Sequence, residues 1–325
     1  MRCVVLDDYQ DAARRFADWS LLGNAVEFVV LRDHLPTEAM VAALRGASIV
    51  VAMRERARFD EATLQRLPDL RLLVTTGAVN AAIDLAAAAA LGITVCGTTS
   101  VSHPAPELTW GLLLALARRI PQEDARFHHG EAPWQASVGL DLAGRTIGIV
   151  GLGRIGARIA RYASAFDMRV LAWSRNLTEA RCAEAGARRA PGLDALLAEA
   201  DIVTLHVVLG PATHGLIGAR ELGLMKPAAL LVNTSRGALV DETALAAALR
   251  AGRIGGAALD VFCEEPLPND HPLRGAPNLV ATPHLGYVTE DNYRLYFGGV
   301  VEDIQAWLAG RPIRVLAAPA VAAPG

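Results

Sequence analysis

Lysine is nearly absent from this sequence. The chain has 31 Lys and Arg residues, and Lys226 is the only lysine among them. This scarcity argues against most mechanisms that use a Schiff-base lysine, and it excludes a Gly-Lys-Ser/Thr phosphate loop. Lys226 itself precedes Pro227, and a helix usually ends before a proline, so we expect a helix terminus there.

Cysteine pairs and metal-binding motifs are also missing. The eight histidines include the adjacent pair His128 and His129, but the sequence has no H-E-x-x-H motif and no C-x-x-C pair. We therefore expect no metal site and no disulfide framework. The four cysteines, which we expect to be reduced and mostly structural, are Cys3, Cys96, Cys182 and Cys263.

Long apolar runs and basic stripes are absent as well. No apolar stretch reaches the roughly 20 residues that span a bilayer, and the start "MRCVVLDDYQ" enters a strand-like pattern without a charged leader. The net charge is −3 and the cations are scattered, so we expect neither a nucleic-acid nor a membrane partner. A cytoplasmic protein that acts on small molecules is the expectation.

What the sequence does have is apolar residues, and enough of them for two domains. The 325 residues are 52% hydrophobic, a length and composition that can bury a large core. Over residues 1–98, Val/Ile/Leu-rich runs alternate with helix-like segments, which is typical of a parallel sheet covered on both faces. The predicted strands are 2–6, 26–31, 48–53, 71–77 and 93–97, and the predicted helices are 11–22, 37–46, 59–68 and 81–92.

A second alternating series follows. Helix-length segments at 105–120 and 289–310 flank it and would link the two series, so the chain would cross between domains twice. We predict two doubly wound α/β domains, one from residues 1–98 plus 288–325 and one from 99–287. The tail 318–325 has little to pack and is expected to fray. The strands predicted in the second series are 145–153, 168–174, 201–208, 229–235, 255–262 and 278–284.

The stretch "GIVGLGRIG" indicates a dinucleotide site. Gly151, Gly153 and Gly156 follow a strand and precede a helix, where glycines permit a tight turn and close approach of a pyrophosphate to the helix N-terminus. The motif alone is a weak signal, but here the strand, the helix and the next strand are all in register. We also expect Arg154 and Ile155 to border the cofactor.

The stretch "VLAWSRN" bears on which cofactor binds. About 20 residues after the glycines, NAD sites usually have an acid that binds the ribose hydroxyls, whereas this chain has Ser174 followed by Arg175 and Asn176. A hydroxyl and a guanidinium can bind a 2′-phosphate that a carboxylate would repel. The pair favours NADP, with NAD as the alternative if Arg175 is an ordinary exposed charge.

Three polar segments each follow an apolar strand. Arg236, Glu265 and His284 could therefore lie at the carboxyl ends of strands, where ligands gather in open α/β sheets. Isolated residues of these types are more often a strand cap, a solvated loop acid and a loop histidine. Spacing alone does not prove a shared cleft.

With these segments in view, the chain resembles the D-2-hydroxyacid dehydrogenase family over essentially its whole length. The motifs "GLGRIG", "MKPAALLVNTSRGALVDETAL", "GRIGGAALDVFCEEPLP" and "TPHLGY" occur in the family's order. The resemblance implies a split flavodoxin-like substrate domain and an inserted Rossmann-type nucleotide domain. It also implies a homodimer formed through the nucleotide domain, a nicotinamide cofactor and a small 2-keto acid substrate.

Matched to the family, Arg236 is the catalytic arginine, Glu265 the acid and His284 the histidine. Reduction of a 2-keto acid needs a proton donor, for which an imidazolium is suited near neutral pH. The carboxylate orients and charges that ring, and the guanidinium holds the substrate carboxylate. The resemblance assigns Asp260 to the nicotinamide amide, with a buried structural aspartate as the alternative, while Cys263 is interpreted as packing.

The substrate side is less regular. "TTGAVN" resembles a family loop whose backbone amides bind a carboxylate, which places Gly77, Ala78 and Val79 near the substrate, and Arg54 resembles a cleft-facing position. Two departures from the family leave the substrate's identity open. Val79-Asn80 replaces a second glycine of that loop, and Tyr287 replaces a small residue. Two more residues, either cleft-lining or structural, are His103 and Trp134.

Two other functions remain as alternatives. Formate dehydrogenases resemble the family but have glutamine in place of the acid, so Glu265 argues against that activity. Nucleotide-sensing corepressors share the fold and much of the catalytic triad, although they carry extensions for which this compact chain has little room. A nucleotide-dependent turnover assay separates these classes.

Overall fold

The computed structural model describes residues 1–319 and forms two compact units. One unit contains residues 1–101 together with the chain from residue 288 onward, and the other contains residues 102–287. The division thus lies between Val101 and Ser102, close to the expected one. The tail expected to fray lies, from residue 320, outside the described residues.

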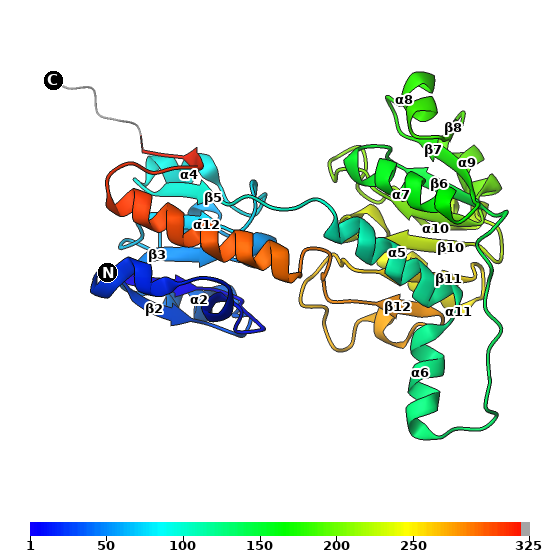
Figure 1. Ribbon diagram of the computed structural model, residues 1–325, viewed down its shortest axis with the longest axis horizontal. Helices are drawn as coiled ribbons and strands as arrows, with labels where there is room; N and C mark the ends of the chain where they lie inside the picture. The colour runs from blue at the N-terminus through cyan, green and yellow to red at the C-terminus, as the bar shows by residue number, and fades with distance from the viewer. Residues whose placement is uncertain (320–325) are drawn as a thin grey trace. The chain divides into compact units, whose positions relative to one another are not determined.

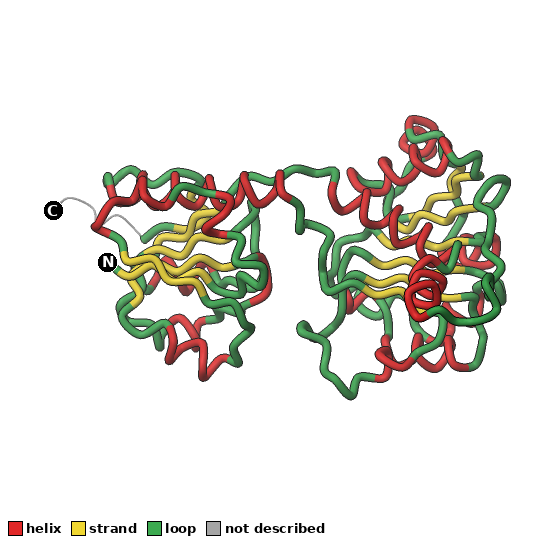
Figure 2. The backbone as a smooth tube through the Cα atoms, turned by 60° about the horizontal axis from the view of Figure 1, so that its bottom comes forward, coloured by secondary structure: helices red, strands yellow, loops and turns green. Residues whose placement is uncertain are grey.

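The first unit contains a six-stranded sheet in the order β13-β5-β4-β3-β1-β2. The strands lie side by side (Figure 2), and the five N-terminal ones are parallel, as the Val/Ile/Leu-rich runs predict. Most residues of β1, β3, β4 and β5 are buried, whereas those of β2 are half-buried or exposed. The sequence did not reveal β13, a three-residue strand that pairs antiparallel with β5. The strands are β1 Arg2–Val5, β2 Glu27–Val30, β3 Ala47–Ala52, β4 Leu72–Thr75, β5 Thr94–Gly97 and β13 Val315–Ala317.

Helices cover this sheet, and one prediction for them was wrong. The segment 11–22 is not a single helix, because Asp18 caps a new turn by accepting a hydrogen bond from Ser20 N, and Gly23 adopts φ +61°. The helical segments of the unit are α1 Ala13–Phe16, η1 Trp19–Ala25, α2 Thr37–Ala43, η2 Arg54–Arg56, α3 Glu61–Leu64, α4 Leu85–Ala90 and α12 Glu290–Leu308.

The C-terminal helix α12 completes the first unit (Figure 1). Its Tyr293 ring packs edge-on against Phe16, with 5.9 Å between centroids. Asp303, wholly buried, accepts a hydrogen bond of 3.0 Å from Arg314 Nε, just before β13. Burial raises the pKa of Asp303 to about 7 despite the guanidinium. The segment that leads into β13 is thereby held against α12.

The second unit contains a seven-stranded parallel sheet in the order β12-β11-β10-β9-β6-β7-β8. The order reverses between β9 and β6, and ligands of open α/β sheets bind at such a switch point. The strand that the sequence did not predict, β8, has only two residues, both arginine. The strands are β6 Thr146–Val150, β7 Arg169–Trp173, β8 Arg188–Arg189, β9 Ile202–Leu205, β10 Leu230–Asn233, β11 Gly256–Leu259 and β12 Leu279–Ala281.

Two apolar cores flank this sheet, one on each face. The helix α5 contributes Trp110 and Leu113 to the first, as its continuous apolar run predicts. Lys226 lies just past the end of α10 and pairs with Asp201 at 2.7 Å. The helical segments are α5 Pro104–Ala117, α6 Ile120–His129, α7 Arg154–Ala165, α8 Glu179–Glu184, α9 Leu193–Glu199, α10 Ala219–Leu224, η3 Gly237–Leu239, α11 Glu242–Arg250 and η4 Pro272–Gly275.

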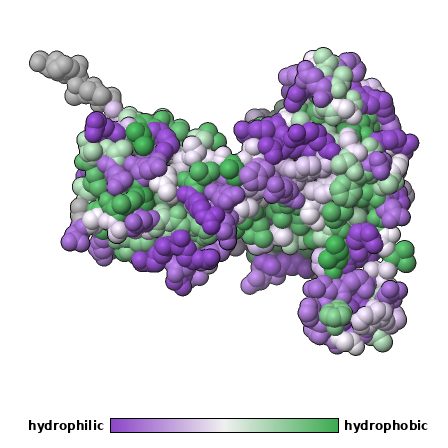
Figure 3. Space-filling view, viewed as in Figure 1, coloured by the Kyte–Doolittle hydropathy of each residue, from purple (hydrophilic) through white to green (hydrophobic). Residues whose placement is uncertain are grey.

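Hydrophilic side chains cover much of the face seen in Figure 3. Among residues 1–319, no helix has the length and apolar character needed to cross a membrane. Within the same residues, no group of three or more His, Cys, Asp or Glu side chains gathers as a metal site would require. His128 and His129 are exposed on the last turn of α6, and the four cysteines are free thiols.

Candidate active site

Two of the predicted catalytic side chains meet at the carboxyl edge of the second sheet. Glu265 follows β11 and His284 follows β12, and Glu265 Oε2 lies 2.6 Å from His284 Nδ1. The other carboxylate oxygen accepts a hydrogen bond of 2.9 Å from Phe262 N, which fixes the acid. Both side chains are about one quarter to one third exposed, so the pair is held in place yet open to a ligand.

Asp260 builds the loop on which His284 lies. Its Oδ1 accepts hydrogen bonds from Thr282 Oγ1 at 2.6 Å and Leu285 N at 2.7 Å, and its Oδ2 accepts one from Gly286 N at 2.8 Å. The residue is 1% exposed, and burial raises its pKa although the three donors oppose this. These bonds match the structural alternative for Asp260; a contact with the nicotinamide amide would have to use its remaining acceptor capacity.

Arg236 follows β10 at the same edge. Asn233 shapes its turn, since its amide donates to Arg236 O at 2.9 Å and its carbonyl oxygen accepts from Ser235 N at 3.1 Å. The next residue, Gly237, touches the loop that carries Glu265: a Cβ there would lie 2.0 Å from the carbonyl carbon of Phe262. The loops after β10 and β11 are therefore in direct contact, and only glycine fits between them.

The sequence analysis assigned no role to Glu242, which joins the same two loops. Glu242, at the start of α11, is 9% exposed, and its Oε1 accepts a hydrogen bond of 2.8 Å from Cys263 N. Its Oε2 lies 3.4 Å from His271 Nε2. The only signal in the sequence was its place in the motif "VDETAL", because an acid early in a helix usually serves the helix itself.

The three glycines of "GLGRIG" behave as a dinucleotide loop requires. A Cβ on Gly151, which has φ +101°, would lie 2.6 Å from His206 O, and a Cβ on Gly156 would lie 2.1 Å from Gly151 O. Nothing lies within 4 Å of the equivalent position on Gly153, which directly precedes α7. The loop is thus closely packed against backbone at Gly151 and Gly156, and it is open at Gly153, where a pyrophosphate would approach the helix N-terminus.

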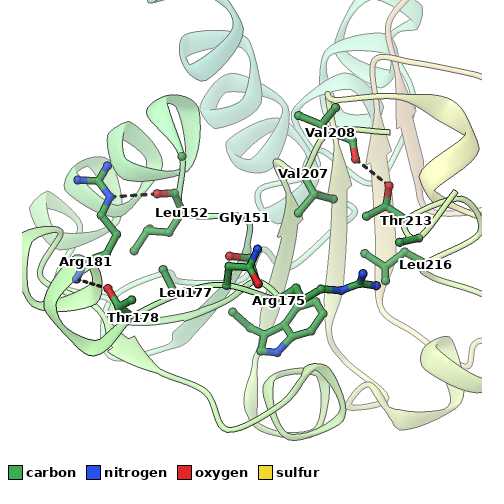
Figure 4. A pocket seen from close by; sticks show the side chains of 15 residues that line it. Gly151, Leu152, Arg175, Leu177, Thr178, Arg181, Val207, Val208, Thr213 and Leu216 are labelled. Atoms are coloured by element: carbon green, nitrogen blue, oxygen red, sulfur yellow. Dashed lines mark hydrogen bonds between the residues drawn. The ribbon is translucent and has the colours of Figure 1, made fainter. Parts of the chain in front are cut away.

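Beside this loop lies a cavity of about 450 Å³ (Figure 4). Five of the residues that the sequence analysis assigns to the cofactor line it: Gly151, Gly153, Ser174, Arg175 and Asn176. None of its fifteen lining residues is acidic. Arg154, Ile155, Gly156 and Asp260, which were also expected at the cofactor, do not line it. The lining residues that the sequence did not single out are Leu152, Trp173, Leu177, Thr178, Arg181, Val207, Val208, Ala212, Thr213 and Leu216.

The cavity and the loop together fit a nicotinamide dinucleotide. Figure 4 shows Arg175 and Arg181 on different sides of the cavity, where Arg181 also donates to Leu152 O. The open backbone at Gly153 and the start of α7 would hold the pyrophosphate. Ser174 and Arg175 would face the ribose of the adenosine half, because they directly follow β7, the strand next to β6.

In the first unit, Arg54 and Gly77 lie in contact, and one expected interaction is not available. The guanidinium of Arg54 lies on Gly77, so that a Cβ there would be 1.8 Å from Arg54 Nη1. Gly77 N already donates to Thr98 Oγ1 at 2.8 Å, so it is not a donor for substrate as the loop resemblance implied. Ala78 and Val79 are exposed.

Asn80, which replaces a family glycine, fastens this loop. Its amide donates to Arg54 O at 2.6 Å and to Thr75 Oγ1 at 2.9 Å, and its carbonyl oxygen accepts from Ala82 N. His103 and Trp134, for which the sequence analysis left a cleft-lining and a structural role open, both belong to the second unit. His103 precedes the first turn of α5, and Trp134 is 80% exposed beside Phe127 of α6.

The chain is similar to known dehydrogenases and reductases of 2-hydroxy acids. Residues 110–286 match the profile of the "D-isomer specific 2-hydroxyacid dehydrogenase, NAD binding domain". The chain is 36% identical to a glycerate dehydrogenase of Methylorubrum extorquens, over 86% of this chain and 89% of the relative. It is 38% identical to a glyoxylate reductase of Aeropyrum pernix, over 85% of this chain and 84% of the relative.

A solved phosphoglycerate oxidoreductase from Vibrio cholerae has the same fold. It matches with a TM-score of 0.90 and 35% identity over 95% of this chain and 99% of that one. Relatives named D-3-phosphoglycerate dehydrogenase are longer: the chain spans about half of the one from Methanocaldococcus jannaschii, at 36% identity over 85% of its own length. From the profile match and these identities, the chain belongs to the D-isomer specific 2-hydroxyacid dehydrogenase family.

Proposed function

We propose that this chain reduces a small 2-keto acid to the D-2-hydroxy acid, and catalyses the reverse oxidation, with NADP preferred over NAD. The observation that carries the proposal is the 2.6 Å contact between Glu265 and His284 at the sheet edge that also holds the nucleotide cavity. A histidine bonded to a carboxylate is a proton donor, and a nicotinamide cofactor supplies the hydride when it is bound.

Three side chains of the second unit have separate roles in this proposal. Glu265 stabilises the imidazolium form of His284 and orients its ring, so that Nε2 can donate a proton to the oxygen of the substrate carbonyl. Arg236 holds the substrate carboxylate and polarises the carbonyl. The residues of the first unit that we propose to bind substrate are Arg54, Ala78 and Val79. The relatives named glycerate dehydrogenase and glyoxylate reductase support hydroxypyruvate and glyoxylate as substrates to test first.

The acid-free cavity supports the cofactor preference. A 2′-phosphate beside Ser174 and Arg175 would meet a hydroxyl donor and a cation, with no carboxylate among the fifteen lining residues to repel it. We also infer a reducing, cytoplasmic setting, in which the free thiols that the structure shows would persist.

A homodimer formed through the second unit is the assembly that we propose. The helix α6 and the segment after it extend from the body of that unit (Figure 1), and they expose large apolar side chains. Phe127 is 63% exposed, Trp134 80% and Val138 93%. Exposed apolar side chains gathered on one projecting segment are typical of an interface rather than of a monomer's surface.

The reaction is tested with a panel of 2-keto acids. Purified protein should oxidise NADPH in the presence of glyoxylate or hydroxypyruvate, and chiral products should be D-isomers by chiral chromatography. His284→Ala should lower kcat by about a hundredfold to ten-thousandfold, the usual contribution of acid catalysis, while NADPH affinity changes little. Exclusive L-product, or no turnover with any 2-keto acid, would refute the proposal.

Glu265→Gln tests the proton donor. An amide cannot stabilise the imidazolium as a carboxylate does, so the alkaline limb of the kcat profile for reduction should move to lower pH. The pH dependence of kcat from pH 5 to 10 measures this shift. Glu264→Gln, at the exposed neighbouring acid, is the matched control and should keep the wild-type profile. If both variants give the wild-type profile, Glu265 has no part in proton transfer.

Arg175→Ala tests the cofactor preference. Loss of a charged hydrogen bond to the 2′-phosphate should lower kcat/KM for NADPH about tenfold, the low end of the usual range because Arg175 is exposed. Activity with NADH should hardly change, and the wild-type preference should shrink as salt is added. Ser174→Asp should reverse the preference. Equal losses with both cofactors would show that Arg175 does not contact the phosphate.

The dimer is tested by light scattering after size exclusion. Trp134→Glu should shift the protein toward the monomer mass, since a carboxylate would be buried in the interface. Leu21→Glu, which is 58% exposed in the first unit, is the control and should keep the wild-type mass. A wild-type protein that is monomeric at micromolar concentration would contradict the proposed assembly.

A further inference from the structure

Tyr287 lies against the imidazole of His284. The two rings are 5.3 Å apart between centroids and cross at 70°, in an edge-on arrangement. Tyr287 is only 9% exposed and follows Gly286, whose amide is held by Asp260. The backbone that precedes Tyr287 is therefore held by the same buried carboxylate that holds the histidine loop.

The imidazole needs such a neighbour. His284 has φ +55°, an uncommon value for a residue other than glycine, and its ring hydrogen-bonds through Nδ1 to Glu265. The torsion that joins an imidazole to its Cβ has a broad energy profile, and the hydrogen bond to Glu265 restrains the ring through one atom only. A proton donor whose Nε2 swings is in the productive orientation for only part of the time.

We propose that Tyr287 is a positioning residue for His284: its ring holds the plane of the imidazole, so that Nε2 faces the oxygen it protonates. The proposal rests on the proposed function, because it concerns the same proton donor. Edge-on aromatic pairs are favoured over looser arrangements, and a small side chain at this position would leave the open side of the imidazole uncovered.

Turnover measurements test this role. Tyr287→Leu keeps an apolar side chain but removes the ring, and it should lower kcat about threefold to tenfold. The KM for NADPH should stay near the wild-type value, and the solvent isotope effect on kcat should rise as proton transfer becomes slower. Tyr287→Phe keeps the ring and should restore most of the turnover.

A matched control separates positioning from stability. Tyr162 of α7 makes a similar edge-on pair with Trp110 in the same unit, with 5.9 Å between centroids. Tyr162→Leu removes a ring from that pair and should lower the Tm without changing the solvent isotope effect. If Tyr162→Leu and Tyr287→Leu change the isotope effect equally, the role assigned to Tyr287 is wrong.

A double-mutant cycle gives the decisive measurement. If Tyr287 acts through the imidazole, then Tyr287→Leu should have no further effect on the residual kcat once His284 is replaced by alanine. His284→Ala and the double variant should then have the same residual kcat. Losses that multiply in the double variant would show that Tyr287 acts independently of His284, and they would overturn the proposal.

A measurement without substrate keeps this inference distinct from the proposed function. The ring protons of His284, identified by their loss from the NMR spectrum of His284→Ala, should be shifted by the tyrosine ring current. They should keep that shift in Tyr287→Phe and lose it in Tyr287→Leu. An inactive wild type with the shift would refute the proposed function and leave the ring contact in place. An active wild type without it would refute the role of Tyr287.

Discussion

One buried carboxylate determines where His284 lies. Asp260 receives hydrogen bonds from Thr282, Leu285 and Gly286, and His284 lies within the loop that these three donors close. A carboxylate that is 1% exposed loses its hydration, and the loop replaces it. The tie also runs from one strand to the next, because Asp260 follows β11 while the loop follows β12. The position of His284 is therefore fixed by a contact with the neighbouring strand's loop as well as by its own loop.

The loops after β10 and β11 are joined by close contacts. Gly237 lies against the backbone of Phe262 with no room for a Cβ, and Glu242 holds the amide of Cys263. The loops that carry Arg236 and Glu265 are therefore coupled to each other. A site assembled from three strands keeps its geometry only if its loops are fixed to one another, and here each fixing contact uses backbone atoms or a nearly buried acid.

Sequence motifs located the strands, the glycine loop and the pair formed by Glu265 and His284. These features depend on local patterns: continuous apolar runs for buried strands, and residue types that the chemistry requires. They did not locate β8 and β13, which are too short to show a pattern, nor the role of Glu242, whose partner is a backbone amide far away in sequence. For the same reason, the sequence could not show that Gly77 N is already engaged by Thr98. Contacts between distant loops leave no periodic signal in the chain.

The return of the chain through α12 and β13 bears on synthesis at the ribosome. The second unit is one continuous segment, residues 102–287, and all of its strands emerge before α12 is made. The first unit needs both ends of the chain, since Arg314 must reach Asp303 and β13 must pair with β5. Its N-terminal strands must therefore wait, with one sheet edge unpaired, while the nucleotide-binding unit can already fold. The order of completion is opposite to the order in which the two units begin.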